Sequence, residues 1–122
     1  MTLIISGTGQ GKPAYVLEKL HLGPEDIACD PEAAREKPVL GKLEEWLRNH
    51  PEPDWDGLLA ANPNLVILCD EVGCGVVPMD PAERAWRELV GRTCCHLASR
   101  AQCVQRLFCG LATNLKGEPN WN

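Results

Sequence analysis

Two short stretches of this sequence carry residue types that could bind a phosphate group and a metal ion. In residues 6–13, three glycines at alternate positions precede Lys12. A glycine-rich turn that leads into a helix presents backbone N–H groups to an anion, and a lysine there neutralises phosphate charge. The second stretch is Asp70-Glu71, where two carboxylates follow an apolar run. An acid pair at such a place is most often two solvated side chains, while carboxylate oxygens can also bind a hard cation such as Mg²⁺.

The residues expected to contact phosphate are those of the turn itself. Proline at its last position offers neither a backbone N–H nor a hydroxyl, so the turn keeps its anion cradle while its magnesium site is impaired. The expected set is Gly7, Thr8, Gly9, Gln10, Gly11, Lys12 and Pro13.

Strands and helices must bring these stretches together. Residues 3–5 form a short apolar run before the turn, and a helical pattern follows over residues 14–20. The continuous apolar run 65–69 is typical of a strand buried on both faces of a parallel sheet. It ends at the two carboxylates and a glycine segment with Gly73 and Gly75. Since ligands bind at the carboxyl edge of open α/β sheets, we expect both stretches at that edge.

The rest of the chain completes an α/β pattern. Asp80-Pro81 is a helix start signal, and apolar residues then recur at helical spacing to residue 101. The segments expected to be regular are strands at 27–29 and 104–109 and helices at 39–49, 55–61 and 81–101. We therefore predict one three-layer α/β domain over residues 1–122, with a small, mostly parallel sheet of about four strands.

One block of the sequence resembles a known enzyme family. The residues that carry the resemblance are Asp70-Glu71-Val72-Gly73-Cys74-Gly75-Val76-Val77-Pro78, Arg84, Trp86-Arg87, Gly91-Arg92, Gly110-Leu111 and Leu115-Lys116. They are similar to the C-terminal part of the bifunctional adenosylcobinamide kinase/adenosylcobinamide-phosphate guanylyltransferase of cobalamin biosynthesis. The similar block covers somewhat under half of the chain.

The resemblance implies a fold, an activity and partners. It implies a P-loop NTPase-like (RecA-like) domain that transfers a phosphoryl group from GTP or ATP, with Mg²⁺, to the aminopropanol hydroxyl of a cobinamide. In that setting Lys12 and Glu71 would be catalytic, and Asp70 and Glu71 would hold the metal. The family assembles as a homotrimer, which makes self-association an expectation here.

The chain also departs from the family pattern. Ser6 stands at the first glycine of the family's G-G-x-x-S-G-K-S loop, Pro13 at its final hydroxyl and Asp70 at a usual asparagine. The segment with the histidine that takes up the guanylyl group is missing, and His21, His50 and His96 lie in no such motif. Two classes stay open: a small cobinamide kinase without the guanylyltransferase half, or a non-catalytic relative that binds a nucleotide, a corrinoid or a partner protein.

Composition narrows the remaining options. A net charge of −5 gives no basic footprint for nucleic acid. No apolar run is long enough to span a bilayer, and residues 1–3 lack the basic start of a signal peptide. The seven cysteines show no C-x-x-C spacing, which favours reduced thiols over a zinc site. We therefore expect a cytoplasmic protein.

Overall fold

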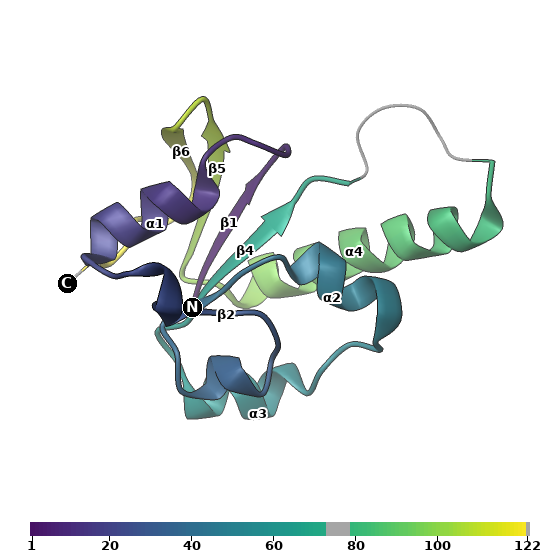
Figure 1. The fold of residues 1–122 in the computed structure, drawn as a ribbon, viewed down its shortest axis with the longest axis horizontal. Helices are drawn as coiled ribbons and strands as arrows, with labels where there is room; N and C mark the ends of the chain where they lie inside the picture. Colours follow the sequence, from purple (N-terminus) through teal and green to yellow (C-terminus); the bar gives the residue numbers. More distant parts are fainter. Residues whose placement is uncertain (73–78, 122) are drawn as a thin grey trace.

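The computed structural model describes residues 1–72 and 79–121 of the chain. Within this part, one sheet of six strands runs through the molecule, and only its last strand is antiparallel to its neighbour (Figure 1). In sheet order the strands are β2 (Ile27–Ala28), β3 (Val39–Leu40), β4 (Val66–Asp70), β1 (Thr2–Ser6), β5 (Cys103–Phe108) and β6 (Leu111–Lys116). The first strand of the chain is thus central, with parallel neighbours on both sides.

Helices cover both faces of this sheet. The α-helices of the described residues are α1 (Lys12–Leu20), α2 (Leu43–Asn49), α3 (Trp55–Ala61) and α4 (Pro81–Arg100), with 3-10 turns η1 (Pro24–Asp26) and η2 (Ala33–Arg35). α1 packs on one face, and α2, α3 and α4 pack on the other (Figure 1). The predicted three-layer α/β architecture with a mostly parallel sheet is confirmed.

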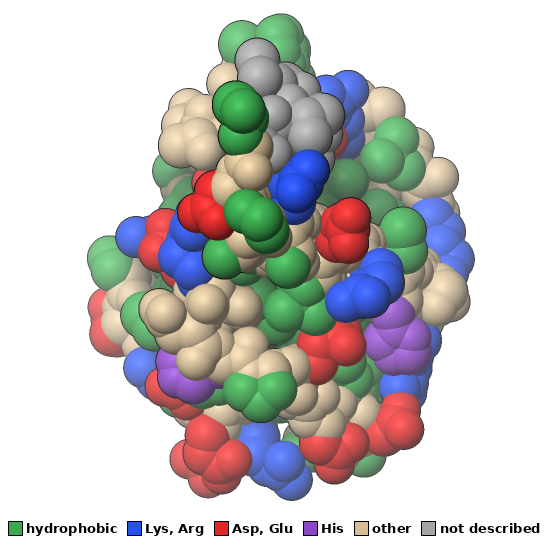
Figure 2. Space-filling model, turned by 90° about the vertical axis from the view of Figure 1, so that its right-hand side faces the viewer, with side chains coloured by type: hydrophobic (Ala, Val, Ile, Leu, Met, Phe, Trp, Pro, Cys, Tyr) green, Lys and Arg blue, Asp and Glu red, His purple; other side chains and the backbone are tan. Residues whose placement is uncertain are grey.

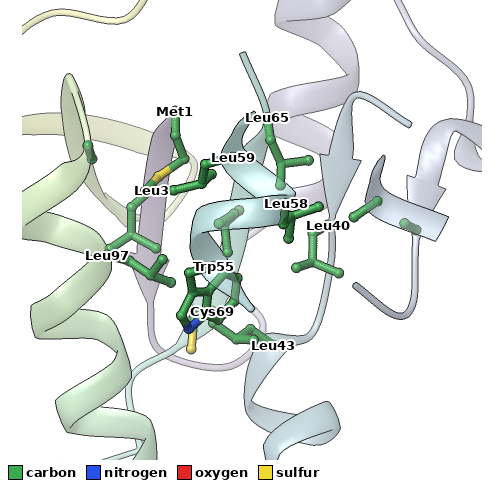
Figure 3. Packing of buried hydrophobic residues seen from close by; sticks show 14 of the residues in the cluster. Met1, Leu3, Leu40, Leu43, Trp55, Leu58, Leu59, Leu65, Cys69 and Leu97 are labelled. Atoms are coloured by element: carbon green, nitrogen blue, oxygen red, sulfur yellow. The ribbon is translucent and has the colours of Figure 1, made fainter. Parts of the chain in front are cut away.

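The middle residues of β1 and β4 are apolar without interruption because both faces of these strands are covered. Leu3 of β1 and Ile67 of β4 join the larger core, which also holds buried residues of α2, α3 and α4. Figure 3 shows Leu3 in this core with Leu58 of α3 and Leu97 of α4. The strand neighbours Ile4 and Leu68 point the other way, into a smaller core closed by Val16 of α1. Successive strand residues face opposite sides, so a strand between two helical layers must be apolar at every position.

The predicted helix over residues 39–49 is wrong at its start. Val39–Leu40 is the strand β3, paired in parallel with β2 and β4, and the helix begins only at Leu43. Apolar side chains continue at helical spacing across the boundary between β3 and α2, so the sequence pattern does not show it. The chain turns at Gly41 and Lys42, where Lys42 has a φ of 51°, a left-handed conformation that no helix interior accepts.

The sequence did not indicate β6, and the strand expected at 104–109 ends one residue earlier. Cys109 and Gly110 have φ angles of 52° and 77° and close a two-residue turn between β5 and β6. Positive φ at both central residues is the pattern of a type I′ hairpin turn. All six residues of β6 are exposed, so the strand lacks the buried apolar alternation by which strands are recognised.

The start signal of α4 operates as predicted. Asp80 accepts a hydrogen bond from the N–H of Ala82 at 2.9 Å, and Pro81 occupies the first turn. The glycine segment with Gly73 and Gly75 lies outside the described residues.

On the face shown in Figure 2, a band of hydrophobic side chains runs between acidic and basic ones, without a continuous patch of one sign.

Candidate functional site

The glycine loop, residues 7–11, connects the carboxyl end of β1 to α1. Gly9 and Gly11 have φ angles of 76° and 86°, which favour glycine at both positions. Gln10 anchors the loop to the β5–β6 turn, because its Oε1 accepts from the N–H of Cys109 at 2.7 Å and its carbonyl from the N–H of Gly110 at 3.3 Å. These contacts with the β5–β6 turn therefore hold the loop against the sheet.

Its backbone amides stay available. Within residues 1–72 and 79–121, none of the N–H groups from Thr8 to Lys12 donates a hydrogen bond to a protein group. They precede the first turn of α1, where helix N–H groups have no partner of their own and the helix dipole favours negative charge. This arrangement can bind an anion.

Lys12 lies under the loop instead of pointing into solvent. Only 6% of the residue is exposed, and its Nζ donates to Ser6 Oγ at 2.7 Å, to the Gly7 carbonyl at 3.4 Å and to the carboxylate of Asp70. Thr8 Oγ1 donates to the other oxygen of that carboxylate at 2.9 Å. Since Ser6 and Asp70 are register partners in β1 and β4, the pairing of the two strands brings the predicted lysine and carboxylate together.

Glu44 extends this cluster, and the sequence analysis missed it. Its Oε1 accepts from the backbone N–H of Asp70 at 2.8 Å, and 6% of the residue is exposed. Burial is the main cause that raises the pKa of the Glu44 carboxyl above its usual range. The available signal is an acid shortly after a strand end, and a helix predicted over residues 39–49 hides that strand end.

Two contacts from α4 hold Glu44 in place. Trp86 Nε1 donates to the Glu44 carbonyl at 2.8 Å. The guanidinium of Arg48 lies 3.7 Å from the centre of the Trp86 ring and donates to Glu83 at 2.8 Å. The first turn of α2 is thus tied to α4, which fixes the backbone from which the Glu44 side chain reaches β4.

Glu71, the second carboxylate of the predicted metal site, lies next to a different strand. It pairs with Arg106 of β5, with 3.1 Å between Glu71 Oε1 and Arg106 Nε, while its N–H donates to the Ser6 carbonyl at 2.7 Å. The structure therefore places Asp70 with Lys12, and Glu71 with a cation on the other side of β1.

A cavity of about 600 Å³ opens beside the glycine loop. Thr8, Gly9, Gln10, Gly11, Lys12 and Pro13 line one side of it. The rest of the lining comes from Asp70, whose carboxylate contacts Lys12 and Thr8, and from residues that follow β2 and β3, among them Cys29, Gly41, Lys42, Glu44 and Glu45. The size of the cavity is that of a small-molecule site. Backbone amides, a lysine and carboxylates in one cavity are the groups that phosphate and a metal-bound phosphate need.

Fold and site together define the class: an α/β protein of the P-loop NTPase type, with a glycine loop and a lysine at the carboxyl edge of its central strand. A model of the cobinamide kinase/cobinamide phosphate guanyltransferase family matches residues 38–115, well over half of the chain. The chain belongs to this family, and its role lies in cobinamide metabolism. No curated protein matches the chain.

The family match and the glycine loop are separate observations. The match begins at residue 38, so it includes Glu44, Asp70 and Glu71 and leaves out residues 7–12. The loop is therefore assigned from its own geometry. None of the helices within residues 1–72 and 79–121 is long and apolar enough to cross a membrane.

Proposed function

We propose that this chain is a nucleotide-binding phosphotransferase that moves the terminal phosphoryl group of GTP or ATP to the hydroxyl of a cobinamide. The observation that carries the proposal is Lys12, buried at the cavity wall beneath loop amides that have no partner among residues 1–72 and 79–121. Phosphoryl transfer depends mainly on positioning and charge neutralisation, which such a wall can provide.

In this proposal the glycine loop holds the β- and γ-phosphates. The amides from Thr8 to Lys12 donate to phosphate oxygens, and Lys12 turns its ammonium from Asp70 toward the bound anion. Pro13 lines the cavity but has no backbone N–H to donate to a phosphate. Ser6 keeps Lys12 in place through the 2.7 Å hydrogen bond that it accepts.

The donor set fits a magnesium ion at Asp70. In nucleotide sites Mg²⁺ takes one or two carboxylates and completes its shell with phosphate oxygens and water. The Asp70 carboxylate lines the cavity, and bound Mg²⁺ would supply further neutralisation of phosphate charge. Glu71, expected in the same role and in catalysis, can join only if its carboxylate leaves Arg106.

The guanylyltransferase half is absent in this proposal. Covalent uptake of a guanylyl group needs an imidazole at the α-phosphate. His21 caps the end of α1, and His50 stacks on Trp46 with 3.6 Å between ring centres. His96 is exposed on α4. None of the three is among the residues that line the cavity.

A second candidate function is a non-catalytic nucleotide- or corrinoid-binding module. Pro13 favours it, because the hydroxyl that would ligate magnesium is missing. The Asp70–Lys12 pair favours it as well, since each charge already satisfies the other in the structure. For either function we expect self-association, as in the family's trimers, because Phe108, Leu111 and Leu115 are exposed on the β5–β6 hairpin.

The test uses purified protein, cobinamide, Mg²⁺ and a nucleoside triphosphate labelled at its γ-phosphate. The kinase proposal predicts label on cobinamide and none on the protein. Nucleotide binding without transfer would decide for the binding module. Acid-labile label from GTP on a histidine would contradict the loss of guanylyl transfer.

A further inference from the structure

The glycine loop divides the carboxyl edge of the sheet into two sides. The cavity lies entirely on one of them, toward β4, β3 and β2, and none of its lining residues comes from β5 or β6. The loop lines this cavity itself, so a nucleotide whose phosphates rest on the loop would present its terminal phosphoryl group there. The other residues that line the cavity, Glu44 among them, would then lie near the group that receives it.

The acceptor side is acidic at its deepest point. Glu44 is almost completely buried, and its carboxylate reaches the end of β4 beside Asp70. The Asp70 carboxylate has the side chains of Lys12 and Thr8 as partners, whereas the Glu44 carboxylate is held by backbone N–H groups, chiefly that of Asp70. An acid held in so little solvent acts on a neighbouring charge far more strongly than one in water.

We propose that Glu44 is the specificity-determining residue of the acceptor site, one that accepts an alcohol and repels the phosphate ester formed from it. This rests on the proposed kinase function and deepens it. A hydroxyl can donate a hydrogen bond to the carboxylate, while a phosphate brings a second negative charge against it. The site then releases its product instead of holding it for a second reaction.

The surroundings keep Glu44 from turning away. The Asp70 N–H fixes one carboxylate oxygen, and Trp86 fixes the Glu44 backbone through its carbonyl. Glu45, the next residue, also lines the cavity but is exposed, so water screens its charge. The two neighbours thus offer a matched comparison, with the same charge in the same cavity at different burial.

The experiment compares the affinities of cobinamide and cobinamide phosphate by calorimetry. A non-hydrolysable nucleoside triphosphate is present at saturation, so that the ester cannot place its phosphate on the glycine loop. We expect the wild-type protein to bind the alcohol at least tenfold more tightly than the ester. Glu44→Gln keeps an acceptor for the Asp70 N–H and should reduce this ratio to threefold or less, whereas Glu45→Gln should leave it within twofold of wild type.

Equal wild-type affinity for both compounds, or an unchanged ratio in Glu44→Gln, would overturn the proposal. A loss of the ratio in Glu45→Gln would overturn it too. Should Glu44→Gln not fold, Glu44→Asp and Glu44→Asn form a second pair of equal length and nearly equal shape, of which one carries the charge, and only the aspartate is expected to keep the preference. If the protein binds no nucleotide, the kinase proposal fails, and the same ratio measured without nucleotide still decides the role of Glu44.

Discussion

The two sides of the glycine loop use acid–base pairs in different ways. On the β4 side, the side chain of Lys12 is 8% exposed in its pair with Asp70, and both residues line the cavity. On the β5 side, the side chain of Arg106 is 53% exposed in its pair with Glu71, and neither residue lines the cavity. Solvent screens the second pair, so it contributes little.

The difference between the two ion pairs indicates which of them can take part in ligand binding. The attraction within a buried ion pair recovers little of the free energy that it costs to remove both charges from water, so the pair adds little net stability. A ligand that offers a better partner can therefore replace one of the two residues. A phosphate is such a ligand for Lys12, because it brings more negative charge than Asp70 alone. The exposed pair of Glu71 and Arg106 has no comparable free energy to release. The hydrogen bond from the Glu71 N–H to the Ser6 carbonyl of β1 has a structural role. The predictions below test this contrast.

The largest effect is expected for Lys12→Ala. The variant should bind nucleoside triphosphate more weakly by about 1.5–3 kcal/mol, the range for a hydrogen bond to a charged group. Calorimetry measures the loss. Lys42 lines the same cavity but is exposed, and Lys42→Asn is a control that tolerates the left-handed backbone at this position. Equal affinity of Lys12→Ala and wild type would place the phosphates elsewhere.

Glu44→Ala should lower the free energy of unfolding by about 1–3 kcal/mol, because the Asp70 N–H loses its acceptor in a buried position. Urea unfolding followed by circular dichroism measures this change. Glu44→Gln retains an acceptor oxygen and should lose clearly less than Glu44→Ala. If both variants are equally destabilised, the charge and not the hydrogen bond stabilises the end of β4.

Pro13→Ser should improve nucleotide affinity, and the gain should be larger when magnesium is present. The serine restores both the missing N–H and the hydroxyl that can ligate the ion, for a gain of about 0.5–1.5 kcal/mol. Pro13 is exposed in the first turn of α1, so the fold should accept the change. Titrations with Mg²⁺ and with EDTA separate the two contributions, and an equal gain in both would show that the hydroxyl does not reach a metal.

Arg106→Gln should have the smallest effect. It breaks the exposed pair with Glu71, and we expect less than about 1 kcal/mol of lost stability and an unchanged nucleotide affinity. The urea and calorimetric measurements above apply without change. A loss of affinity comparable to that of Lys12→Ala would mean that the β5 side also serves the ligand, and the contrast between the two sides would fail.

Sequence alone predicted the elements with strong local signals. The apolar runs of β1 and β4 and the capped helix α4 follow from burial on two faces and from Asp80-Pro81. The short strand β3 and the exposed strand β6 did not follow. The strand β3 has only two residues, too few to show a periodic pattern. The edge strand β6 is stabilised by backbone pairing and needs no apolar pattern.

The site was predictable to the same degree. Glycines before Lys12 and acids at the end of β4 are local patterns, and strand pairing brings them together. Glu44 was not accessible in this way, since its place depends on β3 ending at Leu40 and on the contact of Trp86 from α4. The opposite placements of Asp70 and Glu71 also depend on two cations from other elements, Lys12 of α1 and Arg106 of β5.

The central claim is that a nucleoside triphosphate places its phosphates on the glycine loop and draws Lys12 from Asp70. A crystal structure of the protein with a non-hydrolysable nucleoside triphosphate and Mg²⁺ tests this most directly. We predict phosphate oxygens within hydrogen-bond distance of the amides from Thr8 to Lys12, the Lys12 ammonium on a phosphate, and the Asp70 carboxylate turned to the metal. A nucleotide bound elsewhere, with Lys12 still on Asp70, would contradict the account.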